Sequence, residues 1–175
     1  MAARKPLGSN SASDAEALKA RALQILAENR IMGVATLRAD GWPQATMVGY
    51  ANDGLVLYFA ISRGSQKLAN MARDPRVSIA IGHHEADEAG PRGLSLAATV
   101  SEVTDAAAVR RLNDLIQERY PEQAVFTPSG ASIALMKALP VVISLIDPAS
   151  GQDKPLLLRV DRGGALKPEA AEALS

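Results

Sequence analysis

Three short extended segments joined by tight turns, between residues 31 and 61, constrain the fold of this chain more than any other feature. Ile31–Arg38 and Pro43–Tyr50 flank Ala39-Asp40-Gly41-Trp42, in which the Asp-Gly pair is typical of a β-hairpin turn. Asn52-Asp53-Gly54 then leads into Leu55–Ile61, which is apolar at nearly every position, as expected of a strand buried on both faces. The pattern predicts a meander of three antiparallel strands.

Helical patterns occur only where the strand pattern is interrupted. The first helix is predicted to begin at Ser13, which has capping-box spacing to Glu16, and the others are expected over residues 65–73, 105–120 and 133–138. Further strands are predicted at Arg76–Gly82, Leu94–Val103, Pro140–Ile146 and Pro155–Val160. About six or seven strands with short turns indicate an α+β chain built around an antiparallel barrel, because the strand–helix alternation of a parallel doubly wound sheet is missing.

Composition limits the classes of partner and compartment. The length suits one domain, expected over residues 13–162 between a disordered tail at 1–12 and a second tail at 163–175. Nineteen Lys and Arg residues balance nineteen Asp and Glu residues, which argues against nucleic acid or an anionic membrane as a partner. The absence of cysteine excludes disulfides, iron–sulfur clusters and thiolate zinc sites. Because no apolar run approaches the roughly 20 residues that span a bilayer, and no signal peptide is recognised, a cytoplasmic location is expected.

Common catalytic and metal-binding motifs are missing or incomplete. No Gly-x-Gly is present, which excludes the dinucleotide fingerprint of a Rossmann domain. His83 and His84 are followed by several acidic residues, but adjacent side chains on an extended segment point to opposite sides. A solvated loop therefore fits this segment better than a metal site. No metal is predicted, and no catalytic acid or base can be assigned.

The segment most informative about chemistry is Tyr58–Asn70, where a buried strand runs through a short loop into the start of a helix. Free N–H groups at a helix N-terminus, a capping hydroxyl and nearby cations together bind phosphate well, and Ser65, Arg63 and Lys67 supply these groups. Gly64 lets the backbone approach a ligand oxygen closely. The residues alone leave a second interpretation open, in which Ser65 only caps the helix while Arg63 and Lys67 are solvated.

Three segments, taken in order, carry a resemblance to a known family. They are Ile31–Leu37 leading to Pro43–Val48, Leu57–Ser62 followed by the pair Ser65 and Lys67, and Asn70–Ser78, in which a short helix ends at Asp-Pro. In this order and spacing, residues 15–160 resemble the pyridoxamine 5′-phosphate oxidase-related family of FMN-binding split β-barrel proteins. The resemblance implies a split antiparallel β-barrel with flanking helices. It also implies a homodimer that binds FMN in clefts between its subunits.

The same resemblance implies which residues hold the cofactor. Ser65 and Lys67, with Arg63, occupy the phosphate-binding positions. The strand segment at 60–62 lies where backbone groups run beside the isoalloxazine and ribityl chain, and the segment at 46–48 lines the ring. The implied cofactor-binding residues are therefore Thr46, Met47, Val48, Ala60, Ile61, Ser62, Arg63, Ser65 and Lys67.

The carboxyl end departs from pyridoxamine phosphate oxidase itself. Leu157–Arg162 contains neither the tryptophan nor the Arg-x-His-type segment of that enzyme, which argues against vitamin B6 oxidation. The prediction is an FMN-dependent oxidoreductase acting on an unidentified small substrate, with NAD(P)H or oxygen as redox partner. Three alternatives stay open: deazaflavin F420 in place of FMN, a haem-binding protein with His83 or His84 as axial ligand, and a non-catalytic flavin-binding protein.

Overall fold

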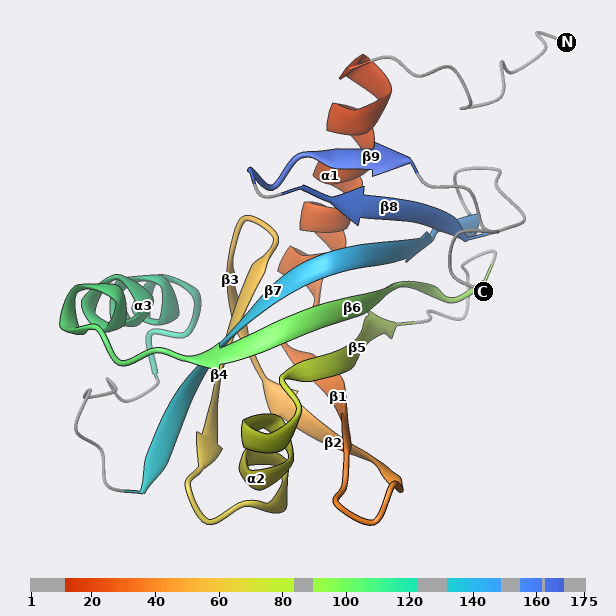
Figure 1. Cartoon of the computed structure of the whole chain (residues 1–175). Helices are drawn as coiled ribbons and strands as arrows, with labels where there is room; N and C mark the ends of the chain where they lie inside the picture. The colour runs from red at the N-terminus through yellow and green to blue at the C-terminus, as the bar shows by residue number, and fades with distance from the viewer. Residues whose placement is uncertain (1–11, 84–89, 123–131, 149–154, 162, 169–175) are drawn as a thin grey trace, which may run out of the picture.

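Nine strands and three helices form the described part of the chain, which in this computed structural model comprises residues 12–83, 90–122, 132–148, 155–161 and 163–168 (Figure 1). The helices are α1 (Ala12–Glu28), α2 (Gln66–Arg73) and α3 (Ala106–Arg119). The strands are β1 (Ile31–Leu37), β2 (Pro43–Gly49), β3 (Ala51–Asp53), β4 (Val56–Ser62), β5 (Arg76–His83), β6 (Arg92–Glu102), β7 (Ile133–Ile146), β8 (Leu156–Val160) and β9 (Leu166–Pro168). None of the described helices is long and apolar enough to cross a membrane.

The sheet is antiparallel throughout and divides at β7. The strand order is β2-β1-β5-β6-β7-β4-β3, while β8 pairs with β7 and β9 with β8. One edge of β7 pairs with β6, whereas on the other edge its first half pairs with β4 and its second half with β8. Near Pro140, which has no N–H to donate, the register with β6 shifts between Ala97 and Ala98. This arrangement confirms the predicted α+β split antiparallel barrel.

The prediction of a helix at Ile133–Ala138 is wrong, because these residues form the first half of β7. Ala134, Leu135 and Met136 have high helix propensity, and that preference misled the sequence interpretation. In the fold, this half of β7 is paired on both sides, with β4 and with β6. Pairing and burial inside the sheet outweigh the local preference.

The predicted meander of three neighbouring strands is also wrong. β2 pairs with β1, but β4 lies on the far side of the sheet, between β7 and β3. Nor is β4 buried on both faces, because its burial alternates: Leu57, Phe59 and Ile61 point into the main core, while Tyr58 and Ala60 are half-buried against the α3 side. Both faces of β4 are apolar because one packs in the main core and the other packs against α3.

Several element ends differ from the predicted ones. α1 begins at Ala12, one residue before the predicted start at Ser13. β3 and β9 were not predicted, because three residues are too few to show a pattern. β9 pairs with β8 and contributes Leu166 to the main core, in a part of the chain expected to be a tail. Residues 1–11 and 169–175 lie outside the described residues.

Two hydrophobic clusters lie on opposite sides of β4. The main one fills the barrel and receives the apolar face of α1, which buries Leu18, Ala22, Ile25 and Leu26. The smaller one packs α3 against the sheet, and its buried members are Ala51, Val109, Leu112, Ile116, Tyr120 and Leu135. Asp105 caps α3 as predicted, accepting a hydrogen bond from the Ala108 N–H at 2.7 Å.

Candidate functional site

The loop between β4 and α2 is held in place by Ser65. Its N–H donates to the Ser62 carbonyl at 3.0 Å, and its hydroxyl accepts from the Leu68 N–H at 3.4 Å. Ser65 is therefore the N-cap of α2, as the sequence predicted. Helix geometry leaves the N–H groups of Gln66 and Lys67 without intrahelical partners, and the helix dipole adds partial positive charge at this end. The first turn of α2 is suited to an anion.

Lys67 lies in that first turn with its side chain half-buried. Within the described residues no carboxylate pairs with Lys67, and the turn contains no acidic residue. A cation at a helix N-terminus is repelled by the dipole, at a cost of roughly 0.3–1 kcal/mol. The position is unfavourable for a lysine unless an anion binds beside it.

Arg63, the other predicted phosphate-binding cation, is placed differently. Its guanidinium forms an ion pair with Glu102 at the end of β6, with an N–O distance of 2.5 Å. Its backbone N–H donates to the Ser132 carbonyl at 2.9 Å. The structure thus brings Ser65 and Lys67 together but directs Arg63 toward a carboxylate that already neutralises it.

β2 carries the three predicted ring-lining residues on two different faces. Thr46 and Val48 lie opposite Val34 and Met32 and share their inward face, whereas Met47 points outward and is 70% exposed. The Thr46 Oγ1 atom is buried and has no hydrogen-bond partner among the described residues. Because β2 is an edge strand, every second residue also directs its N–H and C=O away from β1.

The predicted segment of β4 offers mainly backbone to a ligand. Ile61 is buried in the main core, Ala60 is half-buried on the opposite face, and Ser62 is exposed at the start of the α2 loop. An Ile61 side chain in the core cannot reach a cofactor on the other face. The expectation of backbone contacts here is therefore compatible with the geometry.

A pocket of about 380 Å³ adjoins Ala60 and extends under α3. It is lined mostly by apolar and aromatic residues, among them Gly49, Tyr58, Leu112, Ile116 and Tyr120. Burial raises the pKa of Tyr58, and the nearby Asp53 carboxylate adds to the shift, so this hydroxyl stays protonated at neutral pH. The sequence interpretation did not find this pocket, because nothing local shows that α3 lies against β4.

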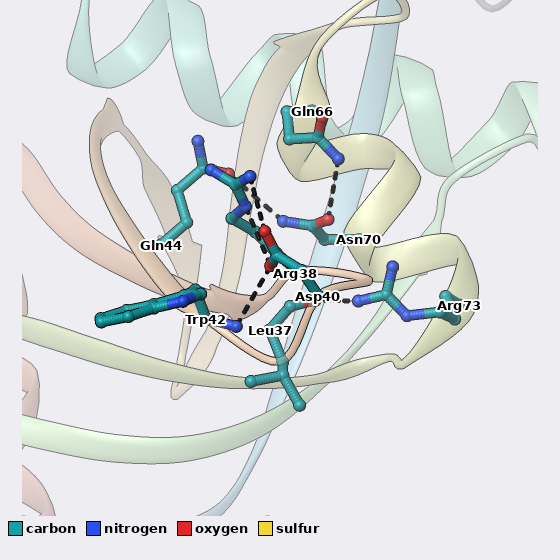
Figure 2. Close-up of polar contacts among 8 residues, drawn as sticks. All are labelled: Leu37, Arg38, Asp40, Trp42, Gln44, Gln66, Asn70 and Arg73. Atoms are coloured by element: carbon teal, nitrogen blue, oxygen red, sulfur yellow. Dashed lines mark hydrogen bonds and ion pairs between the residues drawn. The ribbon is translucent and has the colours of Figure 1, made fainter.

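A buried polar network connects α2 to the β1–β2 hairpin (Figure 2). The Asn70 Nδ2 atom donates to Thr36 Oγ1 at 3.0 Å and to Gln44 Oε1 at 3.2 Å, and its Oδ1 accepts from Gln66 Nε2 at 3.1 Å. At the other end of α2, the Arg73 guanidinium donates to the Leu37 carbonyl. Asn70 and Arg73 thus join the helix to the hairpin at two separate points. The sequence interpretation missed both.

The histidine segment contributes little to the described site. His83 ends β5, half-buried, with its Nδ1 atom 3.4 Å from Asn29 Oδ1. His84 and the acidic residues that follow it lie outside the described residues. In the part of the chain that the structure describes, no group of three or more His, Asp or Glu side chains could hold a metal ion.

Comparisons with known proteins address the family and the fold. The family model described as pyridoxamine 5′-phosphate oxidase matches residues 18–146, while no curated protein matches the sequence. General Stress Protein 26 from Bacillus anthracis superposes with a TM-score of 0.61 at 22% identity, covering 81% of this chain and 98% of that one. The haem storage protein HutZ from Vibrio cholerae gives 0.59 at 20% identity, over 67% of this chain and 86% of its own.

A third solved structure is more similar in sequence. It is an F420 reductase with 28% identity and a TM-score of 0.52, and the match covers 69% of this chain and 94% of the reductase. The two less similar structures support the fold alone, whereas the family model spans most of the barrel and includes the α2 turn. The chain belongs to the pyridoxamine 5′-phosphate oxidase family and has its split β-barrel fold.

Proposed function

We propose that this chain is an FMN-dependent oxidoreductase that acts on a small substrate. The observation that carries the proposal is the half-buried Lys67 at the N-terminus of α2, which has no carboxylate partner among the described residues. A phosphate group bound there removes the repulsion between Lys67 and the helix dipole. It also accepts hydrogen bonds from the N–H groups that helix geometry leaves free.

The residues present fit the rest of FMN. The buried, unpartnered Thr46 hydroxyl and the outward backbone groups of the β2 edge supply hydrogen-bonding positions for a polar ring edge. Met47 and Ala60, which both face away from the main core, supply apolar surface for the ring system. FMN, when bound, supplies the two-electron redox chemistry, and the chain binds, orients and shields it.

We assign the pocket under α3 to the substrate, because it adjoins Ala60 and is mainly apolar. Its mainly apolar lining favours an apolar part of the substrate, and the protonated Tyr58 hydroxyl is available to orient a polar group. NAD(P)H or oxygen is the proposed redox partner. Anaerobic addition of NADH or NADPH to the FMN-loaded protein should bleach its visible absorbance. If neither nucleotide bleaches the flavin, and the colour of dithionite-reduced protein does not return when oxygen is readmitted, the result would argue for a non-catalytic flavin-binding role.

Arg63→Ala is expected to weaken FMN binding by less than about threefold, because the Glu102 carboxylate already neutralises this guanidinium. Titration of the variant with FMN at fixed ionic strength measures the effect. A loss as large as that of a Lys67 variant would show that Arg63 leaves Glu102 to contact the phosphate.

We further propose that the active form is a homodimer. On the outer face of the β1–β2 hairpin every residue is uncharged and apolar: Ile31, Gly33, Ala35, Leu37, Pro43, Ala45, Met47 and Gly49. Ile31, Leu37 and Met47 are 50%, 45% and 70% exposed on this face. An exposed apolar face of this extent is typical of an interface, and it contains Met47 of the proposed ring site. A second copy seated here places the cofactor cleft next to the subunit boundary.

Light scattering should therefore give a mass near twice 18.4 kDa at micromolar concentration. Leu37→Glu buries a charge in the proposed interface and should shift the protein to monomers. Ala20→Glu, at an exposed position on α1, serves as the control and should stay dimeric. Monomeric wild-type protein would contradict both the dimer and a cleft between subunits.

F420 is the second candidate cofactor, favoured by the 28% identity to an F420 reductase. Haem is a third, with His83 as the described candidate for an axial ligand. The three cofactors differ in visible spectrum. A single absorbance scan of ligand-loaded protein separates them.

A further inference from the structure

Asn70 is the most deeply buried polar side chain near the proposed phosphate site, with an exposed fraction of 0%. Both hydrogens of its amide nitrogen are used, one toward Thr36 on β1 and one toward Gln44 on β2. Its oxygen accepts from Gln66, in the first turn of α2. One side chain therefore joins the helix to both strands of the hairpin. Figure 2 shows its contacts with Gln44 and Gln66.

The position of α2 depends strongly on this side chain. α2 has eight residues, and only Leu68 and Met71 pack its apolar side against the main core. Two apolar contacts hold a short helix against the barrel but do not fix its rotation or its shift along the strands. Directional hydrogen bonds from Asn70 to two strands fix both.

The same contacts set the distance between the phosphate-binding turn of α2 and the part of β2 that is proposed to line the ring. Lys67 is one helical turn before Asn70, so the phosphate-binding turn moves with the Asn70 side chain. Gln44 and Thr46 share the inward face of β2, so Asn70 connects that turn to the strand proposed to line the ring. β2 itself is held by pairing with β1 over seven residues and does not need Asn70 to stay in place.

Building on the proposed function, we infer that Asn70 is a positioning residue. It holds the phosphate-binding turn of α2 at the distance from β2 that FMN requires. Without this contact, the ring site on β2 stays intact while the α2 turn is free to shift. Binding of a ligand with both ring and phosphate then weakens more than binding of the ring alone. The ratio of FMN affinity to riboflavin affinity reports this difference. A loss of overall stability does not change the ratio.

The test measures FMN and riboflavin affinity for four variants of the full chain. Asn70→Leu should lower FMN affinity roughly tenfold and riboflavin affinity by less than about threefold. Gln44→Met cuts only the link to β2 and should lower the ratio in the same direction by about threefold, which keeps the test available if Asn70→Leu folds poorly. Arg73→Ala removes the attachment at the far end of α2 and should leave the ratio unchanged. Lys67→Ala is the reference for loss of the phosphate contact.

The outcomes distinguish failure of the positioning role of Asn70 from failure of the proposed function. A lower ratio for Lys67→Ala with an unchanged ratio for Asn70→Leu and Gln44→Met would overturn the positioning role while leaving the proposed function in place. An unchanged ratio in all four variants would overturn the phosphate site and the positioning role together. A fall in the ratio for Arg73→Ala as large as that for Asn70→Leu would show a general effect of loosening α2 and would also overturn the specific role of Asn70.

Discussion

FMN is expected to bind roughly 10- to 150-fold more weakly to Lys67→Ala than to the wild-type protein, while riboflavin binds nearly as before. The expected loss corresponds to one charge-assisted contact to phosphate, worth about 1.5–3 kcal/mol, converted at about 1.4 kcal/mol per tenfold. Riboflavin has the ring but no phosphate, so it serves as the control ligand. Fluorescence titration of apoprotein with each ligand, at one ionic strength, measures both affinities.

Ser65→Ala should act in the same direction, but it also removes the cap of α2 and costs about 1 kcal/mol of stability. Thermal unfolding without ligand separates the two effects. Equal losses of FMN and riboflavin in Lys67→Ala, or no loss of either, would place the phosphate elsewhere.

The largest effect on stability is expected at Arg119, near the C-terminus of α3. Its guanidinium donates to the Leu26 carbonyl at 2.6 Å and also to the Ala27 and Asn29 carbonyls at the end of α1. It lies 5.3 Å from the ring centre of Tyr50 and 5.6 Å from that of Tyr120. One side chain thus donates to carbonyls at and just beyond the end of α1, carries a charge favourable to its dipole, and joins the two hydrophobic clusters.

Arg119→Met should therefore lower the free energy of unfolding by about 3 kcal/mol, because it removes the charged donor to the half-buried Asn29 carbonyl and to Asn52 Oδ1. The Leu26 carbonyl keeps its hydrogen bond from the Tyr50 hydroxyl. For a chain of this length, a loss of about 3 kcal/mol corresponds to a fall of roughly 6–12 °C in the unfolding midpoint. Arg110→Met, at an exposed position on the same helix, is the matched control and should change the midpoint by no more than about 2 °C. Equal shifts in the two variants would contradict the role assigned to Arg119.

The signals that correctly predicted structure were local ones. Ser65 and Asp105 cap helices as predicted, because a hydroxyl or carboxylate near the first free N–H groups is visible in a few residues of sequence. The Asp-Gly turn of the β1–β2 hairpin was visible for the same reason, since Gly41 has a positive φ of 86°. Such features depend on neighbours in the chain and not on the tertiary fold.

The errors arose where a partner far along the chain decides the structure. β4 pairs with β7, more than seventy residues later, and no turn signal between them reveals this. Ile31, Gly33 and Ala35 form the apolar outer face of β1 and alternate with buried neighbours, but the sequence alone does not show which of the two apolar faces stays exposed. Asn70 could not be found, because an asparagine in a polar helix is indistinguishable from a solvated one until Thr36 and Gln44 are placed beside it.

The central claim, that this chain holds FMN by its phosphate at the N-terminus of α2, is tested most directly by competition among cofactors. Purified protein is incubated with equimolar FMN, F420 and haem, freed of excess ligand, and heated, and the released ligand is identified by mass. A phosphate site at the N-terminus of α2 predicts that wild-type protein releases FMN and that Lys67→Ala releases much less. Release of F420 or haem in preference to FMN, or equal FMN release from both proteins, would contradict it.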